Sequence, residues 1–268
     1  MDRESLSRVM YLTNTDVISE TNNQCHVCLN ETTLTKEHVP PKSAFNDCTS
    51  LWERLYTPPK AKASASRVNI RGGFRVRTLC QPCNSELCSG YASEYVKFVR
   101  QLVESPQLFD GWSSKRIISL QCDTLMVAKE IAAMILAVEP LAFAKHCPDL
   151  RNFVLNPTLR FKPAFDVFAF LVPDVPEAGT VSRMHGRVDC YAPGFGMIGG
   201  EISRFPFGFV FAHNLGEGYD HSTLTNITHW FHQEHPSATV SLAPRLTGIE
   251  SIKCGVGSQR SRPQIDYV

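Results

Sequence analysis

The fold expected for this chain is decided by the stretch Thr35-Lys36-Glu37-His38-Val39-Pro40-Pro41-Lys42. Two Cys-x-x-Cys pairs enclose this stretch, with Cys25 and Cys28 before it and Cys80 and Cys83 after it. Four thiolates are the full ligand set of a closed, tetrahedral structural zinc site. The sequence therefore predicts a zinc ion bound by the four cysteines, and this leaves the histidine of the stretch for another role.

An asparagine follows the second cysteine pair directly. Asn84 precedes an expected helix over residues 85–103, so a folded zinc site would hold it at the start of that helix. A hard cation bound by oxygen ligands stabilises the negative charge that builds up during phosphodiester hydrolysis. A neutral imidazole can take a proton from water at neutral pH. Together with Glu37 and His38, Asn84 points to metal-dependent cleavage of nucleic acid.

These residues resemble the HNH endonucleases, members of the ββα-metal (His-Me finger) superfamily, in their zinc-knuckle form. The resemblance covers roughly residues 20–105. It implies an α+β protein that begins with a zinc-stabilised ββα-metal nuclease domain. It also implies that Glu37 and Asn84 bind one catalytic Mg²⁺ or Mn²⁺, and that His38 is the general base that deprotonates the attacking water.

The rest of the chain is similar to a bacterial HNH family with an extra C-terminal domain. Three short motifs carry this similarity: Ala128-Lys129-Glu130-Ile131, Pro206-Phe207-Gly208-Phe209 and Asn226-Ile227-Thr228-His229. The resemblance implies a nuclease domain over residues 1–110 and an α+β domain over residues 111–268, with a role in recognition, regulation or dimerisation. It further implies cleavage of foreign DNA, as in antiviral defence.

The chain departs from the family pattern at the middle Asn of HNH, which orients the catalytic histidine. That residue would fall near Arg75, and the nearest asparagine is Asn69. The orienting hydrogen bond to His38 therefore comes either from Asn69 or from a main-chain carbonyl, or else the base is poorly positioned and activity is weak.

Positive charge is concentrated in one block of a chain whose formal net charge is only +1. Seven basic residues and no acid lie between Arg54 and Arg77. Alternation of basic or polar with apolar residues over 67–77 predicts a β-hairpin turned at Gly72-Gly73, with an arginine-rich face. Such a face suits phosphate contacts. The residues expected to contact phosphate are Lys42, Arg67, Arg71, Arg75 and Arg77.

Composition favours a chain that buries a core and works inside the cell. It has 268 residues, 43% of them hydrophobic, and ten cysteines, which are read as reduced thiols. We find no apolar run long enough to span a bilayer and no signal-peptide pattern at the start. We therefore expect a cytoplasmic protein that binds DNA and no membrane, with RNA and a homodimer left open as partners.

The second half of the chain predicts an α+β domain with a mostly antiparallel sheet. A strongly apolar helix is expected over residues 123–143, followed by strands at 165–171, 187–191, 207–212, 226–231 and 239–242. Glu94 is interpreted as an exposed helix carboxylate rather than an extra metal ligand. The histidines at 229, 232 and 235 are interpreted as surface or core residues rather than a second metal site.

Three functions fit this sequence. The first is a metal-dependent endonuclease that hydrolyses phosphodiester bonds in DNA. The second is a non-catalytic zinc module that binds nucleic acid through its arginines. The third is a nuclease that is gated by a ligand of the C-terminal domain.

Overall fold

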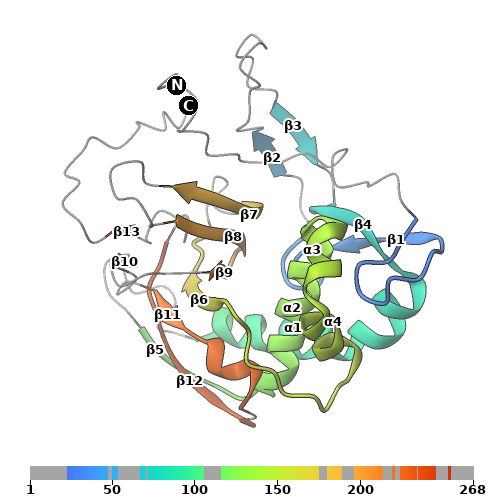
Figure 1. The fold of residues 1–268 in the computed structure, drawn as a ribbon. Helices are drawn as coiled ribbons and strands as arrows, with labels where there is room; N and C mark the ends of the chain where they lie inside the picture. Colours follow the sequence, from blue (N-terminus) through green and yellow to red (C-terminus); the bar gives the residue numbers. More distant parts are fainter. Residues whose placement is uncertain are drawn as a thin grey trace.

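The acid–histidine stretch folds as strand β1 (Leu34–His38), which pairs antiparallel with β4 (Arg75–Cys80) in the computed structural model (Figure 1). His38 lies opposite Arg75 at one end of this pair. The structure describes residues 23–47, 50–53, 67–70, 72–105, 116–174, 180–188, 196–213, 219–220, 224–233, 235–245 and 253–254.

The predicted hairpin over residues 67–77 is wrong. β3 (Arg67–Ile70) pairs antiparallel with β2 (Ser50–Glu53) instead of with β4. The expected turn residues Gly72 and Gly73 do have positive φ angles of 72° and 85°. The chain nevertheless passes there from one strand pair to the other, so its arginines are divided between two sheets.

A buried asparagine bonds the backbone just before β4. The side chain of Asn46 accepts a hydrogen bond from the Phe74 N–H at 2.9 Å and donates one to the Phe74 carbonyl at 3.1 Å. The Phe74 carbonyl also accepts from the N–H of Val39. Phe74 is therefore anchored both to the segment that follows β1 and to the loop that carries Asn46.

The predicted helix after the second cysteine pair is confirmed. A short π-helical turn, η2 (Pro82–Leu87), leads into α1 (Cys88–Glu104). Apolar side chains recur along α1 at helical spacing and form one buried face. The buried residues of this face are Cys88, Tyr91, Tyr95, Phe98, Val99 and Leu102.

The second expected helix is shorter than predicted. α2 (Thr124–Val138) begins after Asp123, whose carboxylate accepts hydrogen bonds from two backbone N–H groups of the first turn. It ends before Glu139, which precedes Pro140 and has an extended backbone with ψ 155°. Proline disfavours the helical conformation in the residue before it, so α2 ends there. A second helix, α3 (Leu141–His146), begins after the proline.

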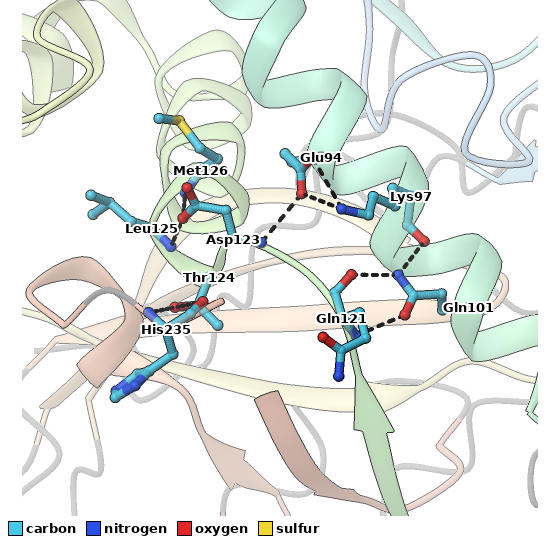
Figure 2. Close-up of polar contacts among 9 residues, drawn as sticks. All are labelled: Glu94, Lys97, Gln101, Gln121, Asp123, Thr124, Leu125, Met126 and His235. Atoms are coloured by element: carbon cyan, nitrogen blue, oxygen red, sulfur yellow. Dashed lines mark hydrogen bonds and ion pairs between the residues drawn. The ribbon is translucent and has the colours of Figure 1, made fainter. Parts of the chain in front are cut away.

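Polar side chains fasten α1 to the segment that enters α2 (Figure 2). Glu94 accepts a hydrogen bond from the backbone N–H of Asp123 at 3.2 Å. The Gln101 amide donates to the Gln121 carbonyl at 2.8 Å and accepts from the Gln121 N–H at 2.7 Å. Glu94 is therefore half-buried and ties two helices together, rather than being an exposed helix carboxylate.

The C-terminal half combines helices with antiparallel sheets, so the chain is α+β. The order in the five-stranded sheet is β11 (Thr225–Asn226), β6 (Asp166–Leu171), β9 (Phe207–His213), β8 (Gly196–Arg204) and β7 (Thr180–Val188). A smaller sheet pairs β5 (Arg116–Leu120) with β12 (Ala238–Leu242). The remaining elements are α4 (Pro148–Leu155), β10 (Tyr219–Asp220), the 3₁₀ helix η4 (Thr228–Phe231) and β13 (Lys253–Cys254).

The strand predicted over residues 226–231 is mostly wrong. Of the predicted residues, only Asn226 lies in a strand, as the last residue of β11. Its side-chain oxygen accepts a hydrogen bond from the Thr228 N–H at 2.9 Å. This contact turns the chain into η4. The helical turn buries both Trp230 and Phe231, whereas successive residues of a strand point to opposite faces.

One hydrophobic cluster joins the helices and sheets of both halves of the chain. The ring of Phe98 on α1 lies 4.8 Å from that of Phe207 on β9 and 5.7 Å from that of Trp230 on η4. The expected junction between residues 1–110 and 111–268 lies within residues 106–115, outside the described part of the chain. None of the described helices is both long and apolar enough to cross a membrane.

Two adjacent ionisable residues of α2 are buried and face different surroundings. The ammonium of Lys129 donates to the carbonyls of Phe153, Asn156 and Leu159 at 2.5, 2.8 and 2.9 Å, and so holds the end of α4. Burial lowers the pKa of Lys129 to about 8, although three carbonyl acceptors favour its charged form. Burial raises the pKa of Glu130 well above its usual range, and its Oε2 has no hydrogen-bond partner.

We expect Lys129→Met to destabilise the protein by about 3 kcal/mol or more. The substitution leaves three carbonyls without this donor, one of them at buried Phe153, and a buried unsatisfied group costs about 1–3 kcal/mol. Urea unfolding at neutral pH measures the change. Lys145→Met is the matched control, because Lys145 is an exposed lysine on α3. Equal stability of the Lys129→Met variant and the native protein would contradict the role given to Lys129.

Glu130→Gln should be more stable than the native chain, and increasingly so at higher pH. The raised pKa means that the folded state binds a proton more tightly than the unfolded state, whose carboxyl titrates at about 4.3. Native stability contributed by this group is therefore lost as pH rises above about 4.3, by at most about 1.4 kcal/mol per pH unit. Unfolding curves of both proteins at pH 5.5 and pH 8 test this; a difference that does not grow with pH would contradict it.

Candidate metal centre and acid–histidine site

Four cysteines from three segments converge on one point. Cys25 and Cys28 lie in a turn that is closed by the Leu29 N–H bonding the Cys25 carbonyl at 2.9 Å. Cys80 ends β4, and Cys83 lies in the η2 turn that follows. Their sulfur atoms all lie within 4.8 Å of one another, so this cluster can hold a metal ion.

The spacing of the sulfur atoms fits a tetrahedral ion. The Sγ atoms of Cys28 and Cys80 are 3.7 Å apart. A tetrahedral zinc ion with bonds of about 2.3 Å sets neighbouring sulfur atoms about 3.8 Å apart. The predicted ligand set is therefore brought together in a geometry that is compatible with structural zinc.

The protein alone does not stabilise four thiolates in this cluster. A hydrogen bond from the Cys83 thiol lowers the pKa of Cys25 to about 4, and the same contact raises the pKa of Cys83 far above its usual range. Burial raises the pKa of Cys28 to about 11. A bound cation would supply the missing positive charge, because metal binding releases the thiol protons.

The cysteine turn is docked on the end of α2. His26 is almost fully buried, and its Nδ1 donates to the Leu136 carbonyl at 2.9 Å. Thr78 on β4 donates its hydroxyl to the Ala137 carbonyl at 2.8 Å. These carbonyls belong to the last turn of α2, which has no partners for them within the helix. The metal cluster and α2 therefore stabilise each other, which spacing alone did not predict.

Glu37 and His38 are the last two residues of β1, and Asn84 bonds the same strand. The Asn84 amide nitrogen donates to the Thr35 hydroxyl at 2.9 Å and to the Lys36 carbonyl at 3.3 Å, which fastens the start of the helical segment to β1. Its amide oxygen is then the atom that Asn84 can offer to a cation. Burial raises the pKa of Glu37 to about 7.

A main-chain carbonyl orients His38. Its Nε2 lies 3.0 Å from the Gly72 carbonyl oxygen. Because a carbonyl only accepts, Nε2 is the donor and Nδ1 of the neutral ring is left as the proton acceptor. Burial lowers the pKa of His38, the Gly72 bond opposes this, and the charges of Arg75 and Lys42 lower it further. Burial and these two charges therefore favour the neutral imidazole.

The predicted phosphate contacts are only partly brought together. Lys42 and Arg77 are exposed and Arg75 is half-buried near His38. Arg67 lies on β3, in the other strand pair, and Arg71 lies outside the described residues. Lys36 was not among the predicted contacts, although it is exposed on β1 and lies opposite the Arg77 region of β4. Its place directly before Glu37 and His38 was the sequence signal that could have identified it.

Asn46 is the other residue that the motif analysis missed. It is almost fully buried and bonds backbone groups on both sides of the site, at Pro40 and Phe74. An orienting bond to His38 comes from the main-chain carbonyl of Gly72, and the side chain of Asn69 lies outside the described part of the structure. A single asparagine in a loop gives no periodic signal, so only the folded chain identifies it.

The histidines at 229, 232 and 235 form no metal site in the structure. Within the described residues, the four cysteines are the one group of three or more potential ligands that converges. The backbone carbonyl of His235 instead accepts a hydrogen bond from the Thr124 hydroxyl at 3.4 Å, beside the start of α2 (Figure 2).

Comparison of the chain with protein-family models, curated proteins and solved structures finds no match.

We expect the purified protein to contain one tightly bound thiolate-coordinated metal ion per chain. Elemental analysis measures this content. Cys28→Ser should lose most of the metal and much of the fold, because binding of a structural ion of this kind contributes on the order of 10 kcal/mol. Cys122→Ser is the matched control, since Cys122 is buried but lies outside the cluster. Metal-free protein that melts like the loaded protein would contradict the structural role.

Proposed function

We propose that this chain is a metal-dependent endonuclease of the HNH type that hydrolyses phosphodiester bonds in DNA. The observation that carries the proposal is the His38–Gly72 hydrogen bond, which leaves Nδ1 of the neutral ring as a proton acceptor, on the strand to which Asn84 is bonded. The cysteine cluster would bind Zn²⁺ and hold this arrangement in place. A role against foreign DNA rests on the family resemblance alone.

The reaction uses His38 as the general base. Its Nδ1 takes a proton from water, the water oxygen attacks the phosphorus atom, and the bond to the leaving oxygen breaks. Glu37 and Asn84 offer oxygen atoms of the kind that Mg²⁺ and Mn²⁺ prefer. An ion bound there would stabilise the negative charge of the transition state and would also favour the ionised form of Glu37.

Substrate binding would use the basic residues around β1 and β4. Lys36, Lys42 and Arg77 are exposed, and Arg75 lies opposite His38. Contacts of such side chains with phosphate position a strand without reading its sequence. This arrangement would place a phosphodiester backbone across the outward side of the strand pair, next to the base.

A second candidate is a zinc-stabilised module that binds nucleic acid without cleaving it. The burial of Glu37 favours this reading, because burial raises the pKa of the carboxyl to about 7 and so disfavours the ionised form that a cation needs. The same basic residues would bind DNA in both cases. Dependence of cutting on a divalent ion and on His38 separates the two functions.

We expect His38→Ala to keep the bound zinc and the fold but to cleave DNA about 10²–10⁴-fold more slowly, the usual contribution of a general base. Single-turnover cleavage of plasmid DNA with Mg²⁺ or Mn²⁺ measures the rate. Asn84→Ala should also weaken the dependence on the divalent ion. His146→Ala is the control, since His146 is an exposed histidine on α3.

Three outcomes of this experiment have different meanings. Loss of cutting in the His38 variant but not in the His146 control, with normal DNA binding, supports the endonuclease. Absence of cutting in the native protein, with DNA binding intact, supports the non-catalytic module. Unchanged cutting by both site variants places any active site elsewhere.

Replacement of one phosphate-contacting residue should change the salt dependence of DNA binding. If Lys36, Lys42 and Arg77 each neutralise one phosphate, each Ala variant should reduce the slope of log affinity against log salt by about 0.9. Binding to duplexes of different sequence should weaken about equally. Lys145→Ala, an exposed change on α3, provides the control. Unaltered slopes in all three variants would remove these residues from the interface.

A further inference from the structure

Asn46 joins the two segments that flank His38. Its amide nitrogen donates to the Pro40 carbonyl at 2.6 Å and to the Phe74 carbonyl at 3.1 Å, and its amide oxygen accepts from the Phe74 N–H at 2.9 Å. Pro40 lies two residues after the end of β1, and Phe74 directly precedes β4. The exposed fraction of Asn46 is only 1%, so these backbone groups have no water to replace the amide.

The glycines before Phe74 bring the backbone into contact with Asn46. A Cβ atom added to Gly73 would lie 1.8 Å from the backbone oxygen of Asn46, so only glycine allows this approach. Gly73 also has a φ of 85°, which favours glycine. The preceding residue, Gly72, presents its carbonyl to His38 Nε2 at 3.0 Å. The position of this acceptor therefore depends on how the Gly73–Asn46 contact is held.

The turn that carries Asn46 is itself closely determined. Phe45 has a φ of 63°, an unfavourable value for a bulky residue, and its ring packs edge-on against Phe205 at 5.5 Å. The Asn46 N–H bonds the Lys42 carbonyl at 3.2 Å. Left-handed backbone at a non-glycine residue persists where surrounding contacts specify it, as often happens at functional sites.

We infer that Asn46 is the positioning residue of this site: it holds the Gly72–Phe74 segment against Pro40, so that the Gly72 carbonyl fixes the ring and the tautomer of His38. Asn46 acts through Gly72 and does not touch the reacting atoms. The catalytic consequence rests on the proposed function, whereas the effect on the His38 tautomer does not. This residue does for the histidine what a family asparagine near Arg75 would have done, from a different part of the chain.

The tautomer of His38 is measured directly by nitrogen-15 NMR of the labelled, metal-loaded full chain at about pH 8, where the neutral ring dominates. His38→Ala identifies the signals. The native protein should show His38 with its proton on Nε2. Asn46→Ala should shift the ring toward a mixture of both tautomers, because the bond from Nε2 to the Gly72 carbonyl is weakened. Asn152→Ala, an exposed change on α4, should keep the native spectrum.

Two glycine variants test the same contact without changing Asn46. Both glycines have positive φ, but a Cβ at Gly72 meets nothing within 4 Å, whereas one at Gly73 collides with Asn46. Gly73→Ala should therefore disturb the tautomer of His38 much more than Gly72→Ala does. If Asn46→Ala fails to fold, this pair still decides the question. A native His38 spectrum in folded, metal-loaded Gly73→Ala or Asn46→Ala protein would overturn the inference.

Cleavage assays add the catalytic consequence. A displacement of the base of about 1 Å can cost on the order of 10²-fold in rate, so the single-turnover rate of Asn46→Ala should fall by about that factor with DNA affinity unchanged. A protein that shows the tautomer shift but no nuclease activity in its native form would refute the proposed function and support the role of Asn46. Native cleavage together with an unshifted tautomer in both variants would support the proposed function and refute the role of Asn46.

Discussion

The convergence of four thiols is the constraint on which the rest of the site depends. Cys28 and Cys80 are separated by 52 positions in sequence, and closing a flexible loop of that length costs about 3.5 kcal/mol plus a constant. A structural metal ion would offset this cost several times over, since its binding contributes on the order of 10 kcal/mol. The closure is consistent with β1 lying beside β4 and with Asn84 bonding Thr35, on the strand that carries the acid–histidine pair.

The cysteine cluster is also coupled to the helices of the second half of the chain. His26 and Thr78 supply the hydrogen-bond donors that the last turn of α2 lacks, and Phe98 of α1 packs between Phe207 and Trp230. Removing the later elements would expose an apolar face of α1 and leave His26 without its partner. A fragment that contains only the cysteine cluster, β1, β4 and α1 would therefore be less stable than the full chain. The described C-terminal elements thus help to stabilise the site.

Regular spacing predicted the parts of this molecule that depend on local chemistry. The cysteine pairs, the helix after Asn84 and the antiparallel strands followed from spacing and apolar pattern. The hairpin over 67–77 was wrong because period-two alternation indicates strands but not their partners, and β3 pairs with β2. Single polar residues with long-range partners, such as Asn46, carry no periodic signal, and neither does the burial of Glu130. The burial that raises the pKa of Glu37 likewise has no signal in the sequence pattern.

Orientation of a histidine by a main-chain carbonyl changes what a catalytic motif must contain. The acceptor at Gly72 is present whatever side chains stand at positions 69 and 75, so the absence of the expected asparagine there does not by itself disorder His38. The Gly72 carbonyl must keep its position relative to His38. The backbone segment that carries it can be held by any buried amide side chain that bonds both the N–H and the carbonyl of one residue in that segment. Asn46 meets that requirement at Phe74, and a glycine at position 73 is needed for it to approach. The residues that orient such a histidine can therefore lie in a loop that sequence motifs ignore, while the motif position itself can carry a charge such as that of Arg75.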